Sequence, residues 1–357
     1  MQEGLSKEEN EIILALLDSS VRPLFFFHDD PDGLASFLLF YRYKGDGRGV
    51  VVKSTPRVDG KFLKIVKDYC PDRIFILDIA LIDQEFIDQA GTDIVMIDHH
   101  EPISMHAIKY FNPRIKQPDR NIPCSLLCHD VIPKANREMD EWIAMVGSVG
   151  DWHLPMFSED FAKRYPMLLP EKIINPAEAL FNTRLGELIL IFSFILKGKT
   201  KDIHQSIKYI SRVKDPEEIL SQMTHEGTHV YKKARSNGKT YFELLQQALD
   251  LRSEDMIFEF IYKDDTTSFT KELSNILLFK NPGKIIIVGR KKSDEVKLSL
   301  RSDGIKLPKI LEHALGDVEG YGGGHEYACG ACVKAQDYKK FLENIKKQVF
   351  LKKKTLQ

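Results

Sequence analysis

The feature of the sequence that most restricts its fold is an alternation of short apolar runs and amphipathic segments over the first 155 residues. The apolar runs, each expected to form a strand, are Arg22–His28, Gly49–Ser54, Arg73–Ile79 and Asp93–Asp98. Segments with a helical pattern separate them, at Gly33–Tyr43, Val58–Tyr69 and Ile82–Ala90. Apolar runs without period-two alternation, separated by helices, are typical of a parallel sheet that is covered on both faces. We therefore predict an α/β fold that binds its ligands beyond the carboxyl ends of the strands.

The length of 357 residues predicts two domains, because single cores rarely grow past about 250–300 residues. Residues 156 to about 250 carry only helical patterns, and a second α/β pattern starts at Asp255. Its expected strands are Met256–Tyr262, Lys284–Gly289 and Glu295–Arg301, its expected helices are Thr270–Phe279 and Leu307–Leu315, and a glycine-rich loop, GYGGGHEYACG, follows. We expect an N-terminal parallel-sheet catalytic domain over residues 1–185, a helical connector over 186–250 and a smaller C-terminal α/β substrate domain over 251–357.

The composition narrows the class of protein. Hydrophobic residues make up 43% and charged residues 29%, which is typical of a soluble globular protein. The net charge of -1 indicates no general attraction to nucleic acid, so such a partner would need a local basic patch. No apolar run approaches about 20 residues, no signal peptide is visible, and five cysteines form no disulfide framework. We expect a cytoplasmic protein without a membrane partner.

Acidic and histidine residues follow several of the expected elements. The first expected strand ends in His28-Asp29-Asp30-Pro31-Asp32-Gly33, and the third ends at Asp78. The fourth strand ends in Asp98-His99-His100. A predicted helix through Trp142–Val149 ends in Gly150-Asp151-Trp152-His153. One aspartate at a strand end is usually a turn former or a helix cap. Four such clusters are hard to explain as caps, and in an open α/β sheet these ends converge on one crevice.

So many carboxylates in one crevice would repel one another unless a cation neutralised them. Mixed imidazole and carboxylate ligands favour manganese, iron or zinc over calcium, and hard carboxylates tilt the choice toward manganese or magnesium. Two metal ions about 3.5–4 Å apart would generate a nucleophile at neutral pH and stabilise both oxygens of an in-line displacement at phosphorus. The sequence therefore predicts a two-metal site for phosphoester chemistry.

These motifs resemble those of the DHH phosphoesterases, a superfamily of RecJ-type exonucleases, NrnA-type oligoribonucleases and cyclic-dinucleotide phosphodiesterases. Asp98-His99-His100 is the motif that names the family, and His28-x-Asp30-x-Asp32-Gly33 is similar to the first motif of archaeal RecJ-like proteins. Asn112-Pro113 and Pro123-Cys124-Ser125 resemble segments that follow the third motif. Ser299-Leu300-Arg301-Ser302 and Gly322-Gly323-Gly324-His325 resemble the C-terminal substrate domain of the family.

The resemblance implies a role for each matching residue. His28, Asp30 and Asp78 would bind one manganese ion, and Asp32, Asp78, His99 and Asp151 the other, with Asp78 bridging and Mg²⁺ as a substitute metal. Asp32, Asp78 and His100 would carry the catalysis, and His100 would hydrogen-bond the scissile phosphate. Bacterial RecJ proteins have aspartate where His28 stands, which leaves the metal preference of the first site open.

The glycine segment and Arg301 are the expected substrate-binding residues. Gly322, Gly323 and Gly324 allow backbone N–H groups to approach an anion closely, and His325 adds a donor. Arg301 presents a planar fork that suits phosphate. Alone, three glycines are a flexible turn, but after LSLRS at this distance they are expected to hold the nucleotide beyond the scissile bond.

Two other patterns are interpreted as structural. Cys329-x-x-Cys332 lies in an expected strand, so its thiols would face opposite sides, and a zinc site is not expected. Arg57, Lys61, Lys64 and Lys67 are spaced to share one face of a predicted helix, which is usually a solvated face. A role in following the phosphates of a substrate stays open for them.

The predicted function is hydrolysis of phosphodiester bonds in single-stranded DNA or RNA, in the manner of an exonuclease. Alternatives within enzymes are a short-oligonucleotide (nanoRNA) hydrolase, a phosphatase for phosphoadenosine phosphate and a cyclic-dinucleotide phosphodiesterase. The alternative of another class is a replication-associated scaffold with little activity, for which residues 156–250 would offer a surface to a replication or repair protein. Polarity and the choice between DNA and RNA are not visible in the sequence.

Overall fold

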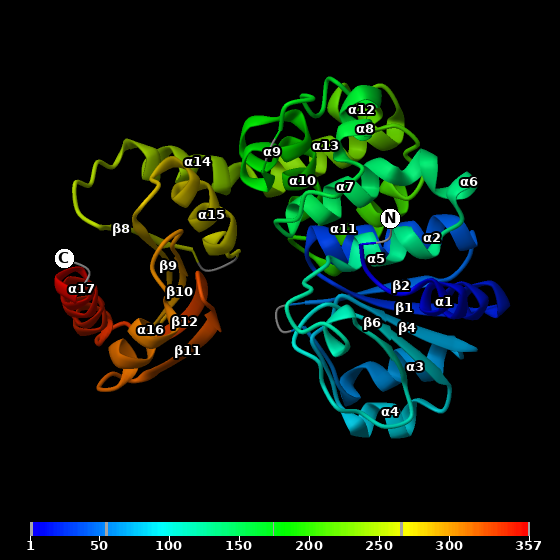
Figure 1. Ribbon diagram of the computed structural model, residues 1–357, viewed down its shortest axis with the longest axis horizontal. Coiled ribbons are helices and arrows are strands. Elements are labelled where there is room, and N and C mark those ends of the chain that lie inside the picture. Colours follow the sequence, from blue (N-terminus) through cyan, green and yellow to red (C-terminus); the bar gives the residue numbers. More distant parts are fainter. Residues whose placement is uncertain (1–2, 54–55, 174, 265–266, 356–357) are drawn as a thin grey trace. The chain divides into compact units, whose positions relative to one another are not determined.

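The computed structural model describes residues 3–53, 56–173, 175–264 and 267–355, and it divides into two compact units, Met1–Asn237 and Gly238–Gln357 (Figure 1). Both units are α/β structures, as the sequence predicts. The finer division of the first unit into a catalytic domain that ends at residue 185 and a connector over 186–250 stays a prediction.

The N-terminal unit is built on a sheet in the order β2-β1-β4-β6-β7 with parallel pairing throughout. Its strands are β1 (Pro23–His28), β2 (Arg48–Val52), β4 (Arg73–Leu77), β6 (Asp93–Ile97) and β7 (Lys109–Phe111). Three consecutive phenylalanines, Phe25 to Phe27, are fully buried in β1, which requires cover on both faces. The predicted parallel sheet is therefore confirmed.

Helices cover both faces of this sheet (Figure 1). On one face, α3 (Leu63–Tyr69) and α4 (Gln84–Ala90) pack on a core that includes Phe26, Ile76 and Met96. On the other, α2 (Pro31–Lys44) places Phe37 against Phe25 and Phe27. Behind α2 lie α5 (Cys124–Val131) and α7 (Glu141–Gly150), and α1 (Lys7–Ser19) packs beside α5.

The segment from residue 57 to 69 differs from the single predicted helix. It forms a short strand, β3 (Arg57–Val58), a 3-10 turn, η1 (Gly60–Phe62), and only then α3. Strand β3 pairs with β5 (Leu81–Ile82), and the Asp59 side chain accepts from the Lys61 N–H, which ends the strand. The expectation that Arg57, Lys61, Lys64 and Lys67 share one helix face is therefore wrong. The end of the predicted strand Gly49–Ser54 lies outside the described residues.

The rest of the first unit is helical, as predicted for residues after 156. Its helices are α8 (Ser158–Arg164), α9 (Pro176–Asn182), α10 (Arg184–Ile195), α11 (Thr200–Ile210), α12 (Pro216–Leu220) and α13 (His225–Asn237). Helix α10 is buried on most sides and packs on α7, α9 and α13. Short elements complete the unit, namely η2 (Pro113–Ile115), α6 (Lys134–Arg137) and η3 (Glu138–Asp140). Within the described ranges, no helix combines the length and apolar character needed to cross a membrane.

The C-terminal unit begins with α14 (Lys239–Asp250) and holds a sheet in the order β11-β12-β10-β9-β8. Its strands are β8 (Ile257–Lys263), β9 (Ile285–Lys292), β10 (Glu295–Arg301), β11 (Gly320–His325) and β12 (Ala328–Lys334). Only the β8–β9 pair is parallel. One face packs on α16 (Pro308–Leu315) and α17 (Tyr338–Thr355), and α15 (Thr270–Lys280) contacts β9 and β10 from the other.

The glycine-rich segment is not a loop, contrary to the prediction. Gly320 to His325 form the edge strand β11, which pairs along its whole length with β12. Glycine disfavours a strand, but the close approach of β12 requires it here, because a Cβ on Gly322 would lie 2.7 Å from the Gly330 oxygen. Cys329 and Cys332 lie in β12, and both are buried free thiols.

Candidate metal centre

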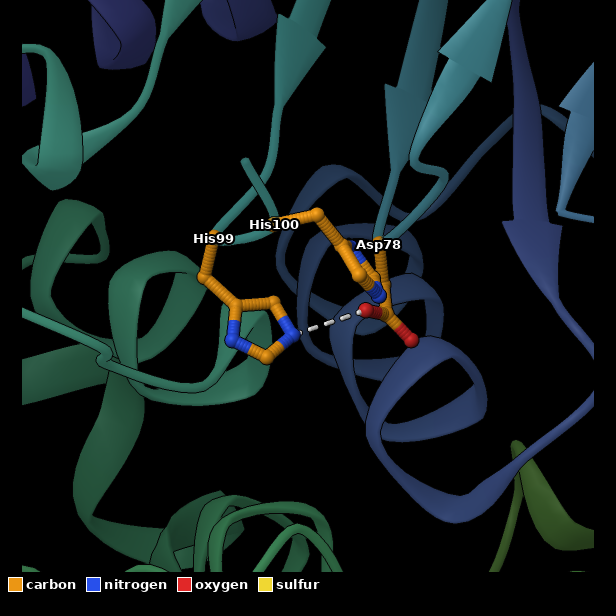
Figure 2. A group of neighbouring side chains, drawn as sticks. All are labelled: Asp78, His99 and His100. Atoms are coloured by element: carbon orange, nitrogen blue, oxygen red, sulfur yellow. Dashed lines mark ion pairs between the residues drawn. The ribbon is translucent and has the colours of Figure 1, made fainter. Parts of the chain in front are cut away.

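Three strands and two helices of the N-terminal unit bring acidic and histidine side chains together, with Asp30 and Asp32 at the start of α2. His28 ends β1, Asp78 follows β4, His99 and His100 follow β6, and Asp151 follows α7. Three groups have ligand atoms within 4.8 Å of one another, namely His28 with Asp30 and Asp78, Asp32 with His99 and Asp151, and Asp78 with His99 and His100. Figure 2 shows the last group, with the Asp78 carboxylate directed at the His99 ring. The structure thus gathers all six predicted metal ligands and His100.

Asp78 lies between two imidazoles, and each of its carboxylate oxygens faces one of them. Its Oδ2 is 3.5 Å from the Nδ1 of His28, and its Oδ1 is 3.2 Å from the Nε2 of His99. The side chain is buried, and its backbone has a φ of 57°, a left-handed conformation that is uncommon outside glycine. This geometry is the one that a bridging carboxylate needs.

Two potential metal-ligand atoms of this centre make no hydrogen bond within the described part of the chain. Among the described residues, the Asp78 Oδ2 and the His28 Nδ1 are buried without a hydrogen-bond partner. Buried polar atoms of a folded protein are nearly always paired, so two such atoms that face each other beside the Asp30 carboxylate mark a place that suits a cation. The donor set of imidazole nitrogens and carboxylate oxygens therefore fits divalent metal ions.

Asp32 and Asp30 are held by helix ends. Asp32 is buried, and its two oxygens accept from the N–H groups of Cys124 at 2.7 Å and Ser125 at 3.0 Å, and from the Ser125 hydroxyl. Asp30 caps α2 by accepting from the Gly33 N–H, while its Oδ2 stays 3.0 Å from the His28 Nδ1. These bonds fix both carboxylates before any ligand arrives.

Both histidines of the DHH motif are oriented by a second residue. The Nδ1 of His99 is 2.8 Å from the Asn121 Oδ1, and because an amide oxygen only accepts, Nδ1 carries a proton and Nε2 is the atom left for a metal ion, once any proton on it is displaced. The Nε2 lies 3.6 Å from the Asp151 Oδ2. His100 is held through its Nδ1, 2.7 Å from the buried Asp98 Oδ1, and its Nε2 faces away from that bond.

The electrostatics of the centre favour cations. Burial opposes the charged form of His28, but Asp30 and Asp78 outweigh it and raise the pKa of His28 well above its usual value. Burial likewise opposes the charge on His99, while Asp78 and Asp151 raise the pKa of His99 well above its usual value. Burial first, and then Asp78 and Asp151, raise the pKa of Asp32. The centre holds protons where a divalent ion would replace them.

Apart from His100, the predicted substrate residues belong to the C-terminal unit. Arg301 donates from Nε to the Asn275 Oδ1 at 2.8 Å and from Nη1 to the Leu300 oxygen at 2.9 Å. Burial lowers the pKa of Arg301 to about 10, and none of the described carboxylates contacts its guanidinium. His325 and the three glycines lie in β11, and no atom lies within 4 Å of a Cβ built on Gly323. The backbone of β11 is therefore exposed, and the space next to Gly323 is open to a ligand.

Sequence reasoning gave no role to four residues that position the centre. Asp98 orients His100, Asn121 orients His99, Ser125 holds Asp32, and the Asn112 Nδ2 donates to the His100 oxygen at 3.0 Å. The resemblance of Asn112-Pro113 and Pro123-Cys124-Ser125 to family segments was the available signal for two of them. Asn121 had no such signal.

Comparison with known proteins agrees with this geometry. The model of the DHH family N-terminal domain matches residues 24–144, and the model of the DHHA1 domain matches residues 255–350, which together make up more than half of the chain. No protein of curated function matches the sequence.

Solved structures share the fold at low sequence identity. A RecJ from Thermus thermophilus in complex with Mn²⁺ is 15% identical with a TM-score of 0.68, over 96% of this chain and 55% of that one. An exonuclease RecJ bound to manganese is 15% identical with a TM-score of 0.58, over 96% and 94%. The DHH domain of a member of the s1p family of ribosomal proteins is 15% identical with a TM-score of 0.66, over 96% and 89%.

This chain therefore spans about half the length of the Thermus RecJ. With an N-terminal segment and a C-terminal segment that each match their family model, the chain carries a DHH family N-terminal domain over residues 24–144 and a DHHA1 domain over residues 255–350.

Proposed function

We propose that this protein is a metal-dependent phosphodiester hydrolase, and more narrowly a single-strand-specific exonuclease of the RecJ type that acts on DNA or RNA. The observation that carries the proposal is the position of Asp78. Its two oxygens face His28 and His99 in a buried centre where orphaned ligand atoms fit two divalent ions. Two such ions suit phosphoryl transfer better than most other chemistry.

The ligand groups divide naturally between the two ions. His28, Asp30 and Asp78 would hold one, and Asp32, Asp78, His99 and Asp151 the other. When bound, the ions would supply Lewis acidity and a nucleophile at neutral pH. The mixture of carboxylates and imidazoles favours Mn²⁺, with Mg²⁺ as a weaker substitute. That RecJ structures hold Mn²⁺ supports this choice.

The remaining residues would bind and orient the substrate. Burial opposes the charged form of His100, but Asp98 raises the pKa of His100 above its usual value, so the ring can donate to a phosphate oxygen. Arg301 supplies a guanidinium without a carboxylate in contact, which suits a second phosphate. His325 and the backbone N–H groups on the free edge of β11 add donors beside it.

Two observations weigh against a scaffold without activity. Each proposed ligand position holds a residue that can bind a metal ion. In addition, Asp98, Asn121 and Ser125 hydrogen-bond His100, His99 and Asp32, respectively. Such orienting bonds serve metal affinity and are not needed by a surface that only docks a partner. A replication or repair protein could still bind the helices of residues 156–250.

The test is digestion of end-labelled DNA and RNA strands of about 20 nucleotides, with a dinucleotide as the short substrate. Manganese should give the highest rate, magnesium a lower one, and metal-stripped protein in EDTA none. Labels at either end give the polarity, and a preference for the dinucleotide would identify a short-oligonucleotide hydrolase. Full activity in EDTA after dialysis would refute the proposal.

A further inference from the structure

The sheet of the C-terminal unit presents one open face that the proposed function does not yet explain. Its register aligns side chains in three rows across neighbouring strands. The first row is Tyr321, Cys332, Lys297 and Arg290, the second is Gly323, Gly330 and Ser299, and the third is His325, Ala328 and Arg301. The third row contains the proposed phosphate ligands, and the first row has no assigned role.

All three rows lie on the face that α15 covers only in part. Ser299 bonds to Thr270 of α15, and a Cβ on Gly322 would instead meet Leu311 of α16, on the opposite face. Because side chains alternate along a strand, Tyr321 and Gly323 then point to the α15 side. Lys297, Gly330 and every residue of β11 are exposed. In the middle row, Gly323 and Gly330 have no side chains, so they form a flat floor between the first and third rows on β11 and β12.

The first row carries two neighbouring cations. Lys297 and Arg290 stand directly opposite each other on β10 and β9. Like charges at opposite positions are destabilising, and a buried cation without a partner is costly. Arg290 is 8% exposed, and its Nε has no hydrogen-bond partner among the described residues. An anion bound beside Lys297 would relieve both costs.

The same row ends in an exposed aromatic ring. Tyr321 is 70% exposed. Tyr321 lies directly opposite Cys332 of β12 in the register, and the Cys332 thiol raises the pKa of the Tyr321 phenol. Exposed aromatic rings beside cations on a sheet are the usual platform for the bases of single-stranded nucleic acid.

We propose that Tyr321 and Lys297 form a second nucleotide subsite, in which a base stacks on the Tyr321 ring and a backbone phosphate binds Lys297. This inference rests on the proposed function, since it assigns the substrate class of the same protein. Tyr321 and His325 are four residues apart in β11, which separates the rows by about 13–14 Å. The two rows would therefore engage different nucleotides, so the unit recognises a strand longer than a dinucleotide.

The test measures binding of the full chain to labelled oligonucleotides in EDTA, where no cleavage occurs. Two lengths are compared, a dinucleotide and a strand of about ten nucleotides, each as DNA and as RNA to identify which is preferred. Tyr321→Ala should weaken binding of the long strand by roughly 5- to 150-fold and leave the dinucleotide unaffected. Tyr321→Phe, which keeps the ring, should bind like wild type.

Lys297→Ala should also weaken only the long strand, and should reduce the slope of log affinity against log salt by about 0.7. Lys291→Ala is the matched control, because Lys291 is exposed near the end of β9 and its partner Val296 belongs to the core on the other face. Melting temperatures of all variants check the fold.

Two results with the Tyr321→Ala variant would overturn the subsite. One is an unchanged affinity of Tyr321→Ala for the long strand, and the other is an equal loss for both lengths. Wild type that cleaves but binds both lengths alike would also reject it and would leave the proposed function standing. Wild type that neither binds nor cleaves any strand would reject the proposed function itself.

Discussion

The two units handle charge in opposite ways. The N-terminal unit gathers carboxylates at one edge of a parallel sheet and buries them, with Asp32, Asp78 and Asp98 nearly inaccessible. The C-terminal unit spreads cations over the open face of a mostly antiparallel sheet, where Lys297 and all of β11 are exposed. Parallel strand ends converge on a point, which suits an ion, whereas a sheet face extends in two directions, which suits a polymer. Under the proposed function, the N-terminal centre carries out the chemistry and the C-terminal face binds the substrate.

The largest effect is expected from removing the charge of Asp78, the carboxylate proposed to bind both metal ions. Asp78→Asn should lower turnover at least about 10³-fold, because it removes a major electrostatic contribution. Asparagine is the suitable replacement, since it tolerates the left-handed backbone of this residue. Steady-state rates with manganese give the effect, and circular dichroism checks the fold.

Asp93→Asn is the matched control for that variant. Asp93 begins β6 at the opposite end of the same sheet, is largely exposed, and pairs with Arg73 at 3.5 Å and Lys109 at 3.6 Å. Its loss should leave turnover unchanged, since exposed pairs contribute little. If Asp78→Asn stayed within tenfold of wild type, the bridging assignment would be wrong.

Lowering the pH should weaken metal binding in the N-terminal unit and leave substrate binding by the C-terminal unit unchanged. The pKa values of His28 and His99 are raised in the metal-free protein, so both rings hold protons at neutral pH that metal must displace. Metal affinity should therefore fall as the pH is lowered, by up to about 100-fold per pH unit for two displaced protons. Titration calorimetry in buffers of different ionisation enthalpy measures the protons released. A release of no protons at neutral pH would contradict this account.

Arg301→Ala should weaken substrate binding and leave the chemical step unchanged. Loss of one charge-assisted phosphate contact should cost roughly 1.5–3 kcal/mol, or about 10- to 150-fold in KM or Kd. Bound metal should be unchanged, because Arg301 is no ligand. If Arg301 is instead structural, the variant will melt earlier while its affinity for substrate stays the same. Melting temperature and affinity on one preparation decide between the two.

The smallest effect is expected from Asn121, which orients a proposed metal ligand but does not bind the metal itself. Asn121→Ala removes the acceptor that holds the His99 ring and should weaken metal binding by about 10- to 100-fold without removing a ligand. Excess manganese should restore turnover, which it cannot do for Asp78→Asn. A variant that stayed slow at saturating metal would show that Asn121 has a further role.

The sequence was enough to predict that these acidic and histidine side chains come together, but not which residues hold them in place. The metal ligands follow strands whose apolar runs are visible locally, and a parallel sheet must bring their ends together. Asp32 and its donors on Cys124 and Ser125 are about 90 residues apart in the chain. Such a pairing depends on how α2 and α5 pack, which no local pattern encodes. The same is true of Asn121 and His99.

Local patterns also misled in two places. The cations from Arg57 to Lys67 are spaced as on one helix, but pairing of β3 with β5 takes the first residues into a strand. The glycines from Gly320 to Gly324 look like a turn, yet pairing with β12 makes them a strand. In both cases a long-range strand pairing overrides the local preference of the residues.

The edge position of β11 has a consequence for how the protein behaves at high concentration. An edge strand with one free row of N–H and C=O groups can template another chain and start aggregation. Glycine makes a poor template because it adds no side-chain packing, and Gly324, with a φ of 146°, interrupts the regular pleat. The residues that leave room above this strand therefore also limit self-association through it, and replacing them with β-branched residues should favour fibrils.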